Sequence, residues 1–378
     1  MHHSDFTKTT TDARPCSWML AYSTIDVPLQ SKLEAIVRSH QGVRVFGCTS
    51  FQGVFTPNGF TRGFHILGVT KTDNVRAFPV LRKAGSVRAR SEARAAALEI
   101  RAAAAGSINC ILMHATPGFE ESILAGISEA FDDDPPPVYG GSAADDAMDG
   151  NWRVFLDTEV LEEGFLLVGM TSPQSVLGAF VSGYVPTKTV GRVTAARGRV
   201  VQEIDHAPAA EVYNRWTNGA ISDQLKGGVV LHETVLQPLG RLVDKVGSMP
   251  RYLLSHPHQV LPGGALLFFS EMNVGDELIL MFGTDSALVE RTTQATSRAL
   301  AGSNTVQTIA GGVLIYCGGC VSVLGNRAED AARSFREQLR GAPFVGAATF
   351  GEEGCFAGRT AAANRHGNLM CDAVLFER

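Results

Sequence analysis

Short apolar runs that end in glycine or other small residues alternate along this chain with longer amphipathic segments. The apolar runs predict strands at residues 43–53, 64–70, 108–113, 138–139, 164–170, 265–270, 277–282, 312–317, 344–349 and 370–376. Helical spacing, or a run rich in Ala, Arg and Glu, predicts helices at residues 29–40, 88–105, 118–131, 207–217, 286–300 and 327–339. Together these elements predict an α/β fold (mixed α+β) with mixed sheets covered by helices.

The order of these elements repeats along the chain. Residues 111–170 run from ILMH through a helix to VYGGSAADD and the strand GFLLVGM, and residues 313–376 run from VLIYCGG through a helix to FVGAATFGEE and LMCDAVLF. Residues 33–70 form a third, partial copy, in which 64–70 is the hairpin return of the strand at 43–53. Each copy places a loop of Gly, Ser, Thr and Ala at a strand end. Such loops either permit tight turns or let a ligand approach backbone N–H groups.

The chain divides into three parts by composition. Residues 1–17 are polar, include Asp5 and Asp12, lack the apolar segment of a signal peptide and predict a disordered tail. The polar, glycine-containing stretch at 214–228 predicts a boundary between two related layered α/β domains, at 18–218 and 219–378. The longest apolar runs are much shorter than the roughly 20 residues that span a bilayer, so no membrane association is expected.

Composition and charge exclude several classes of protein. The 378 residues carry a net charge of −5, which argues against a nucleic-acid-binding surface. Basic residues between 76 and 101 are mixed with Glu92 and Glu99, lack interleaved aromatic residues and predict a solvated helix face. Seven scattered cysteines do not suggest a disulfide framework, so a cytoplasmic protein is expected. No familiar catalytic motif is found, which favours a binding module over an enzyme.

Five segments, in this order along the chain, resemble the FIST family. They are GCTSFQG at 47–53, GGSAADD at 140–146, the junction at 193–216, LIYCGGC at 314–320 and FVGAATFGEEG at 344–354. The resemblance covers roughly residues 18–378 and implies an N-terminal and a C-terminal FIST domain in an intracellular sensor for signal transduction. It also implies a small-molecule ligand, with amino acids or related metabolites as proposed ligands, and a separate effector protein as partner. One position departs from the family, which commonly has Arg where this chain has Cys320.

The repeated loops supply the candidate ligand-binding residues. These are Gly47, Cys48, Thr49, Ser50, Gly140, Gly141, Ser142, Asp145, Cys317, Cys320, Gly351 and Glu352. The acidic pairs Asp145–Asp146 and Glu352–Glu353 follow equivalent loops. They are interpreted as exposed turn residues, as acceptors for a ligand ammonium group, or as a general acid–base pair.

Cysteine and histidine leave two further interpretations open. Cys317 and Cys320 form a C-x-x-C, which is either a redox pair, with a thiol-dependent enzyme as the alternative function, or a family cysteine beside a chance one in a buried turn. A zinc site would need two more ligands. Some FIST-type proteins of bacteria are implicated in nitric oxide sensing through His-ligated haem, so haem is an alternative cofactor where none is otherwise required. The candidate haem ligands are His114, His232, His256 and His258, and a single histidine suffices.

Overall fold

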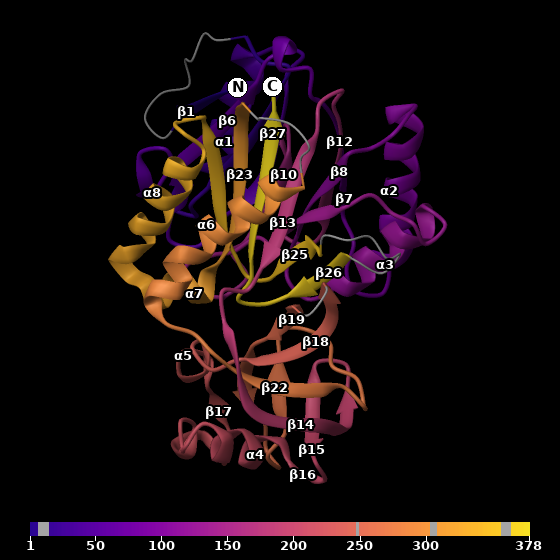
Figure 1. The fold of residues 1–378 in the computed structure, drawn as a ribbon. Coiled ribbons are helices and arrows are strands. Elements are labelled where there is room, and N and C mark those ends of the chain that lie inside the picture. The colour runs from indigo at the N-terminus through magenta and orange to yellow at the C-terminus, as the bar shows by residue number, and fades with distance from the viewer. Residues whose placement is uncertain (7–14, 247–248, 303–307, 357–363) are drawn as a thin grey trace.

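The computed structural model describes residues 1–6, 15–246, 249–302, 308–356 and 364–378, and shows a chain folded into two lobes (Figure 1). The larger lobe, here called the body, is formed by residues 1–181 and 285–378. Residues 185–282 form the small lobe, which lies below the body in Figure 1. The segments 182–184 and 283–284 connect the two lobes. The small lobe is therefore an insertion between two parts of the body.

The body is built from three units that share one order of elements: strand, helix, strand, two-stranded hairpin and return strand. The first unit contains β2 (Trp18–Ser23), α1 (Leu29–Ser39), β3 (Arg44–Thr49), β4 (Val54–Thr56), β5 (Gly59–Thr61) and β6 (Phe64–Val69). The second contains β8 (Cys110–Ala115), α3 (Glu120–Ala130), β9 (Val138–Gly141), β10 (Val154–Leu156), β11 (Glu159–Leu161) and β12 (Phe165–Thr171). The third contains β23 (Ile309–Cys317), α7 (Gly318–Leu324), α8 (Ala328–Gln338), β24 (Phe344–Thr349), β25 (Glu352–Cys355), β26 (Asn364–Gly367) and β27 (Cys371–Glu377). The strand–helix–strand repeat expected from the sequence is confirmed. The partial copy expected at residues 33–70 is part of a full unit, the first of the three.

Each unit gives its hairpin to the sheet of another unit. The hairpin β4–β5 pairs with β24, β10–β11 pairs with β3, and β25–β26 pairs with β9. Each of these three sheets is completed at its other edge by β1 (His2–Asp5), β7 (Arg76–Arg82) or β13 (Val176–Val181), so the three sheets of the body share one strand order. Because the units exchange strands, none of them can complete its sheet alone, and we expect the body to fold as one unit.

Two sequence expectations are corrected by this topology. The strand β6 is not the hairpin return of β3, because β2 lies between them and pairs parallel with β3 and antiparallel with β6. Residues 1–17 are not a disordered tail throughout: β1 pairs with the open edge of β6, and the Phe6 side chain is buried in the core. Residues 7–14 of that predicted tail lie outside the described residues.

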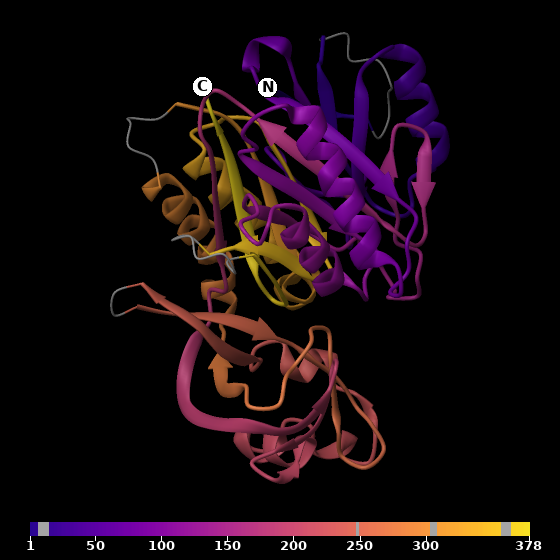
Figure 2. The same ribbon diagram turned by 90° about the vertical axis from the view of Figure 1, so that its right-hand side faces the viewer.

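The helices cover the outer faces of the sheets, while the inner faces meet in a shared core. Helices α2 (Ala89–Ala104) and α3 pack together on the second sheet, and α6 (Asp285–Ala301) packs against α8 on the third (Figures 1 and 2). Alanines on the buried face of α2 and Gly126 of α3 permit this close packing, since a Cβ on Gly126 would lie 2.2 Å from the Arg90 carbonyl oxygen. The shared core contains Tyr22, Leu112 and Ile315, each from a different sheet.

The small lobe is mostly β structure with its own hydrophobic core. Its strands and helices are β14 (Val185–Arg197), β15 (Val200–Ile204), β16 (Ala207–Pro208), α4 (Ala209–Trp216), β17 (Gly228–Val229), α5 (Leu231–Thr234), β18 (Leu239–Val246), β19 (Met249–Ser255), β20 (Pro257–Val260), β21 (Leu266–Phe268) and β22 (Glu277–Phe282). Tyr213, Leu266 and Leu278 are buried in the core between the sheet and α4. The expected domain boundary at 218/219 falls inside this lobe and stays a prediction. Within the described residues, every helix is too short or too polar to cross a bilayer.

Candidate functional site

The three small-residue loops that follow β3, β9 and β24 bond to one another in a closed ring. Equivalent backbone N–H groups donate to equivalent carbonyl oxygens: Phe51 to Ala348 (2.9 Å), Ala144 to Thr49 (3.0 Å) and Phe350 to Ser142 (3.0 Å). The loops are therefore adjacent, as the repeat suggested, and each closes on its neighbour. Most backbone N–H and C=O groups of these loops are therefore hydrogen-bonded within the protein. The residues that face outward are those next to the ring.

Glycines at equivalent positions allow the parallel strands of each unit to approach closely. An ideal Cβ on Gly47 would lie 1.7 Å from the Ala21 carbonyl oxygen, and one on Gly140 would lie 1.8 Å from that of Met113. These residues are register partners in β3 against β2 and in β9 against β8. Strand packing therefore accounts for both glycines without a ligand.

A cavity of about 730 Å³ lies beside the ring, between the body and the small lobe. From the three loops the body supplies Phe51, Asp146, Phe350 and Gly351, and it adds Trp152 and, from the end of β23, Cys317. The small lobe supplies Val229, Leu231, His232, His256, His258 and Phe269. Because the two walls belong to different lobes, the shape of the cavity depends on how the lobes are oriented.

Aromatic rings form much of the cavity wall. The Phe350 ring lies 5.6 Å from the Phe51 ring and 6.3 Å from the Trp152 ring, and on the small lobe His258 lies 4.6 Å from Phe269. Sequence reasoning missed these aromatic residues, although Phe51 and Phe350 occupy equivalent positions after two of the loops.

The predicted site residues separate into two sets. Cys317 and Gly351 line the cavity. The others do not line it, and the buried ones among them form the ring or the layer behind it: Cys48, Thr49, Ser50, Gly140, Gly141, Ser142, Asp145, Cys320 and Glu352. Gly47 lies in the same strand as Cys48, against Ala21.

The four predicted carboxylates differ in environment. Asp145 is buried and accepts hydrogen bonds from backbone N–H groups of the turn that follows it, at residues 147, 148, 150 and 151. Asp146 forms an ion pair of 2.8 Å with Arg62. Glu352 and Glu353 are buried too, so the interpretation of exposed turn residues is wrong for Asp145 and for this pair. Burial raises the pKa of Glu352 to about 8, although Met370 N–H donates to its carboxylate.

A buried cluster of charged residues joins the body to the small lobe. Arg199, at the turn between β14 and β15, contacts Glu120 at 2.6 Å and Glu121 at 2.7 Å, both at the start of α3. Ser142 of the ring donates to Glu120 at 2.7 Å. His366 lies 3.1 Å from Glu353, and its other ring nitrogen faces the Phe269 carbonyl oxygen at 3.3 Å. The ring, the cavity wall and the lobe contact are therefore one connected structure.

Charges in this cluster largely balance one another. Burial disfavours the charged form of His366, but Glu121, Glu120 and the hydrogen bond to Glu353 outweigh it and raise the pKa of His366 to about 10. Burial likewise opposes ionisation of Glu120, yet His366 and Arg199 lower its pKa to about 2. The side chains of Glu120, Glu353 and His366 are close enough to hold a metal ion, with ligand atoms within 4.8 Å of one another. Two cations, Arg199 and protonated His366, already offset the charge of these carboxylates. We therefore interpret the cluster as a set of ion pairs that joins the two lobes.

The raised pKa of His366 predicts a pH dependence of stability. Its contribution is fully present below the unfolded pKa of about 6.5 and is lost as pH rises through about 10, because only the native state retains the proton between these values. We expect the difference in unfolding free energy between wild type and His366→Gln to shrink between pH 6.5 and 10, as measured by urea denaturation. Exposed His206→Gln is the control, and a difference for His366→Gln that stays constant over this range would contradict the assignment.

The four candidate haem ligands are not all in one place. His232, His256 and His258 line the cavity, whereas His114 is buried behind the ring, where it contacts Tyr22 Oη at 3.1 Å and the Gly141 carbonyl at 2.9 Å. Burial lowers the pKa of His114 to about 4 and that of His256 to about 3, so both rings are neutral at pH 7. Of the three that line the cavity, His256 contacts the Leu231 carbonyl at 3.1 Å, and the His258 ring is tilted by 33° against the Phe269 ring.

Comparison with protein-family models gives two matches that together cover most of the chain. The FIST N domain matches residues 17–207, and the FIST C domain matches residues 209–355. No curated protein matches the chain. Residues from both matched regions line the cavity, since Phe51 and Trp152 lie in the first and Cys317 in the second. The chain belongs to the FIST family, whose domains are sensory modules that bind small molecules in signal transduction.

Proposed function

We propose that this chain is a sensor whose small-molecule ligand binds in the cavity between the body and the small lobe. The observation that carries the proposal is the cavity itself, whose walls come from both lobes. Its volume of about 730 Å³ falls within the range of roughly 300–1,000 Å³ typical of ligand sites. A ligand that contacts both walls favours one relative orientation of the lobes, which is the change that a partner protein would read.

The wall chemistry favours a ligand with an aromatic or apolar part. Phe51, Trp152, Phe269 and Phe350 offer ring faces, and Asp146 is already paired with Arg62. Among the described residues that line the cavity, none is Lys or Arg, so nothing there neutralises a strongly anionic ligand. Within the ligand class that the family suggests, aromatic and apolar amino acids and their derivatives therefore fit best.

Thermal-shift screening of the full chain tests this proposal. A ligand present at 100 times its Kd stabilises the native state by about 2.7 kcal/mol and raises the Tm accordingly. Ser322 lines the cavity from α7, so Ser322→Phe should reduce the affinity at least tenfold, whereas Ser322→Ala should bind as wild type does. Equal binding by both variants, or no shift with any amino acid or derivative, would reject the cavity as the ligand site.

Haem is a second candidate, favoured by the two neighbouring histidines, His256 and His258, on the small-lobe wall. His258 and His256 are the residues that would hold the iron, and a bound haem would supply the site for a gas such as nitric oxide. Protein from haem-supplemented expression should show a Soret band that His258→Ala or His256→Ala alters and His114→Ala does not. A colourless preparation would exclude this candidate.

A further inference from the structure

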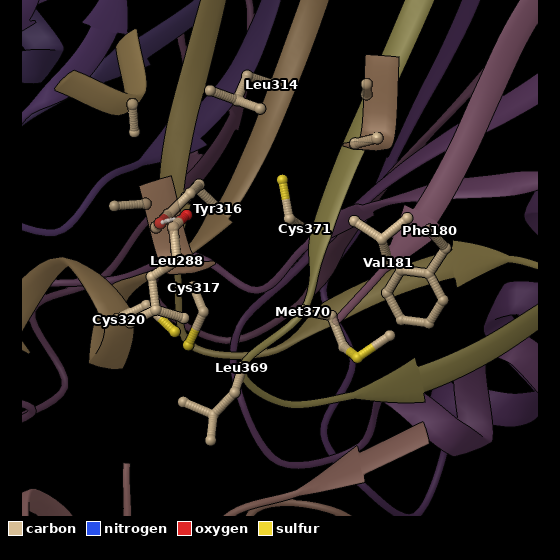
Figure 3. Close-up of a cluster of buried hydrophobic side chains, with 14 of the residues drawn as sticks. Phe180, Val181, Leu288, Leu314, Tyr316, Cys317, Cys320, Leu369, Met370 and Cys371 are labelled. Atoms are coloured by element: carbon tan, nitrogen blue, oxygen red, sulfur yellow. Dashed lines mark hydrogen bonds between the residues drawn. The ribbon is translucent and has the colours of Figure 1, made fainter. Parts of the chain in front are cut away.

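The two cysteines of the C-x-x-C lie against each other at the floor of the cavity. Cys317 ends β23, Cys320 lies one turn into α7, and Figure 3 shows their sulfur atoms side by side, apart from that of Cys371. Cys317 lines the cavity and is 5% exposed, whereas Cys320 behind it is fully buried. A Cβ at Gly319 would lie 3.6 Å from the Cys317 sulfur, so glycine at this position leaves the thiol uncovered.

A buried arginine stands beside this pair without a carboxylate partner. Arg291 of α6 is fully buried, lies 3.8 Å from the Tyr316 ring centre and donates to the Leu369 carbonyl at 2.9 Å. In the described part of the chain, its Nε and one terminal nitrogen have no hydrogen-bond acceptor, and no carboxylate forms an ion pair with it. A buried guanidinium requires a compensating anion, because an unpaired charge is costly in the interior.

Cys320 is the ionisable group on which the charge of Arg291 acts most strongly. Burial alone would raise the pKa of the Cys320 thiol, but the hydrogen bond from Cys317 and the positive charge of Arg291 outweigh it and lower this pKa to about 6. Burial and the same hydrogen bond raise the pKa of Cys317. At pH 7 the pair therefore holds one proton between two sulfur atoms, a thiol at the cavity wall and a thiolate beside Arg291.

The thiolate also contacts the segment that connects the two lobes. Tyr184, in that segment, approaches the Cys320 sulfur at 3.5 Å and donates to the Val235 carbonyl of the small lobe at 2.9 Å. Arg291 contacts the Ser182 carbonyl of the same segment at 3.5 Å, and a Cβ at Gly183 would lie 2.8 Å from the Arg291 Cβ. A change in the charge of Cys320 therefore acts on residues 182–184, which connect the two lobes.

We propose that Cys317 and Cys320 form a redox-active dithiol that is oxidised by a low-molecular-weight disulfide entering the cavity, and that this oxidation changes the contact between the lobes. Cys317 passes its proton to Cys320 and attacks the incoming disulfide RSSR, which forms a Cys317–SR bond and releases RS⁻. Cys320 returns the proton to RS⁻ and attacks the Cys317 sulfur, which forms the intramolecular disulfide and releases a second RS⁻. The cysteines lose two electrons, the incoming disulfide gains them, and the products are one RSH and one RS⁻.

The proposal is tested on the full chain with bis(2-hydroxyethyl) disulfide, an uncharged low-molecular-weight disulfide, as the probe. After reaction at pH 7 and acid quenching, peptide mapping should find the Cys317–Cys320 disulfide, while the buried Cys48, Cys110 and Cys371 remain thiols. Cys320→Ser should react more slowly, because it lacks the group that takes the Cys317 proton, and should stop at a mixed disulfide on Cys317. Cys16→Ser should react as wild type does. Random oxidation of the other cysteines, or no reaction at Cys317 in the folded protein, would overturn the proposal.

Two further measurements test the role of Arg291. The reaction rate of wild type should level off above a pH of about 6, because Cys320 is already ionised, and Arg291→Leu should react at least tenfold more slowly at pH 7. If Arg291→Leu does not fold, the pH at which the wild-type rate levels off still tests this role, because it reports the ionisation of Cys320. The oxidised protein should melt below the reduced one, since oxidation leaves Arg291 without its anion. A rate that follows an ordinary thiol pKa, or an oxidised form that melts higher, would overturn this role.

Discussion

Gly140→Ala should unfold the chain or reduce its unfolding free energy by more than about 3 kcal/mol. The added Cβ would lie 1.8 Å from the Met113 carbonyl oxygen, which is held in place by the parallel pairing of β8 with β9. Neither strand can move away easily, because β9 also carries the hairpin β25–β26 of another unit. The backbone of Gly140 has a φ of +152°, which further disfavours alanine. Chemical denaturation followed by circular dichroism measures the effect.

The same measurement on equivalent glycines tests whether the three units are structurally alike. Gly47→Ala should be as harmful as Gly140→Ala, since its Cβ would lie 1.7 Å from the Ala21 oxygen, and Gly346→Ala should be milder, at 2.5 Å from the Leu314 oxygen. Exposed Gly106 is the control, because its nearest atom would lie 3.9 Å away. A Gly140→Ala protein that melts with the wild type would show that β8 and β9 are further apart than described.

Local patterns in the sequence are sufficient to predict the repeat but not the exchange of hairpins. Small residues after β3, β9 and β24, each followed by an apolar return strand, mark the three units in the sequence itself. The hairpin strands are only three or four residues long, and nothing in their composition says which sheet they join. Register with another unit is a long-range property, so local hydrophobic periodicity could not reveal it.

The candidate site was predictable only on the body side. Cys317 and Gly351 follow from the repeat, because each lies at a strand end next to the ring. The opposite wall comes from segments of the small lobe that carry no motif, such as those with Leu231 and Phe269, and only the fold brings them to the cavity. Arg291 shows the same limit: it lies beside Cys320, the position where the family commonly has Arg, but it comes from a different helix.

Arg199→Ala should destabilise the protein by about 3 kcal/mol or more and weaken the contact between the lobes. Arg199 is 20% exposed and its partner Glu120 is 1% exposed, so the substitution leaves a buried carboxylate with only the more distant charge of His366 to offset it. Removing one member of a buried ion pair typically costs about 3–5 kcal/mol. The pKa of Glu120 should then rise, because Arg199 no longer favours its ionised form. Urea denaturation measures the loss of stability, and limited proteolysis between the lobes measures the weakening of their contact.

Two variants distinguish the loss of the ion pair from a general effect of altering the β14–β15 hairpin, which contains Arg199. Arg197 lies two residues before Arg199 in the chain and is exposed, so Arg197→Ala should change stability by less than about 0.5 kcal/mol. Adding Glu120→Gln to Arg199→Ala should recover part of the loss, because a neutral amide can remain buried with its hydrogen bond to Ser142. If the double variant is no more stable than Arg199→Ala, the cost does not come from the unpaired carboxylate. The lobes would then be held by the cavity walls and the contact between His366 and Phe269 instead.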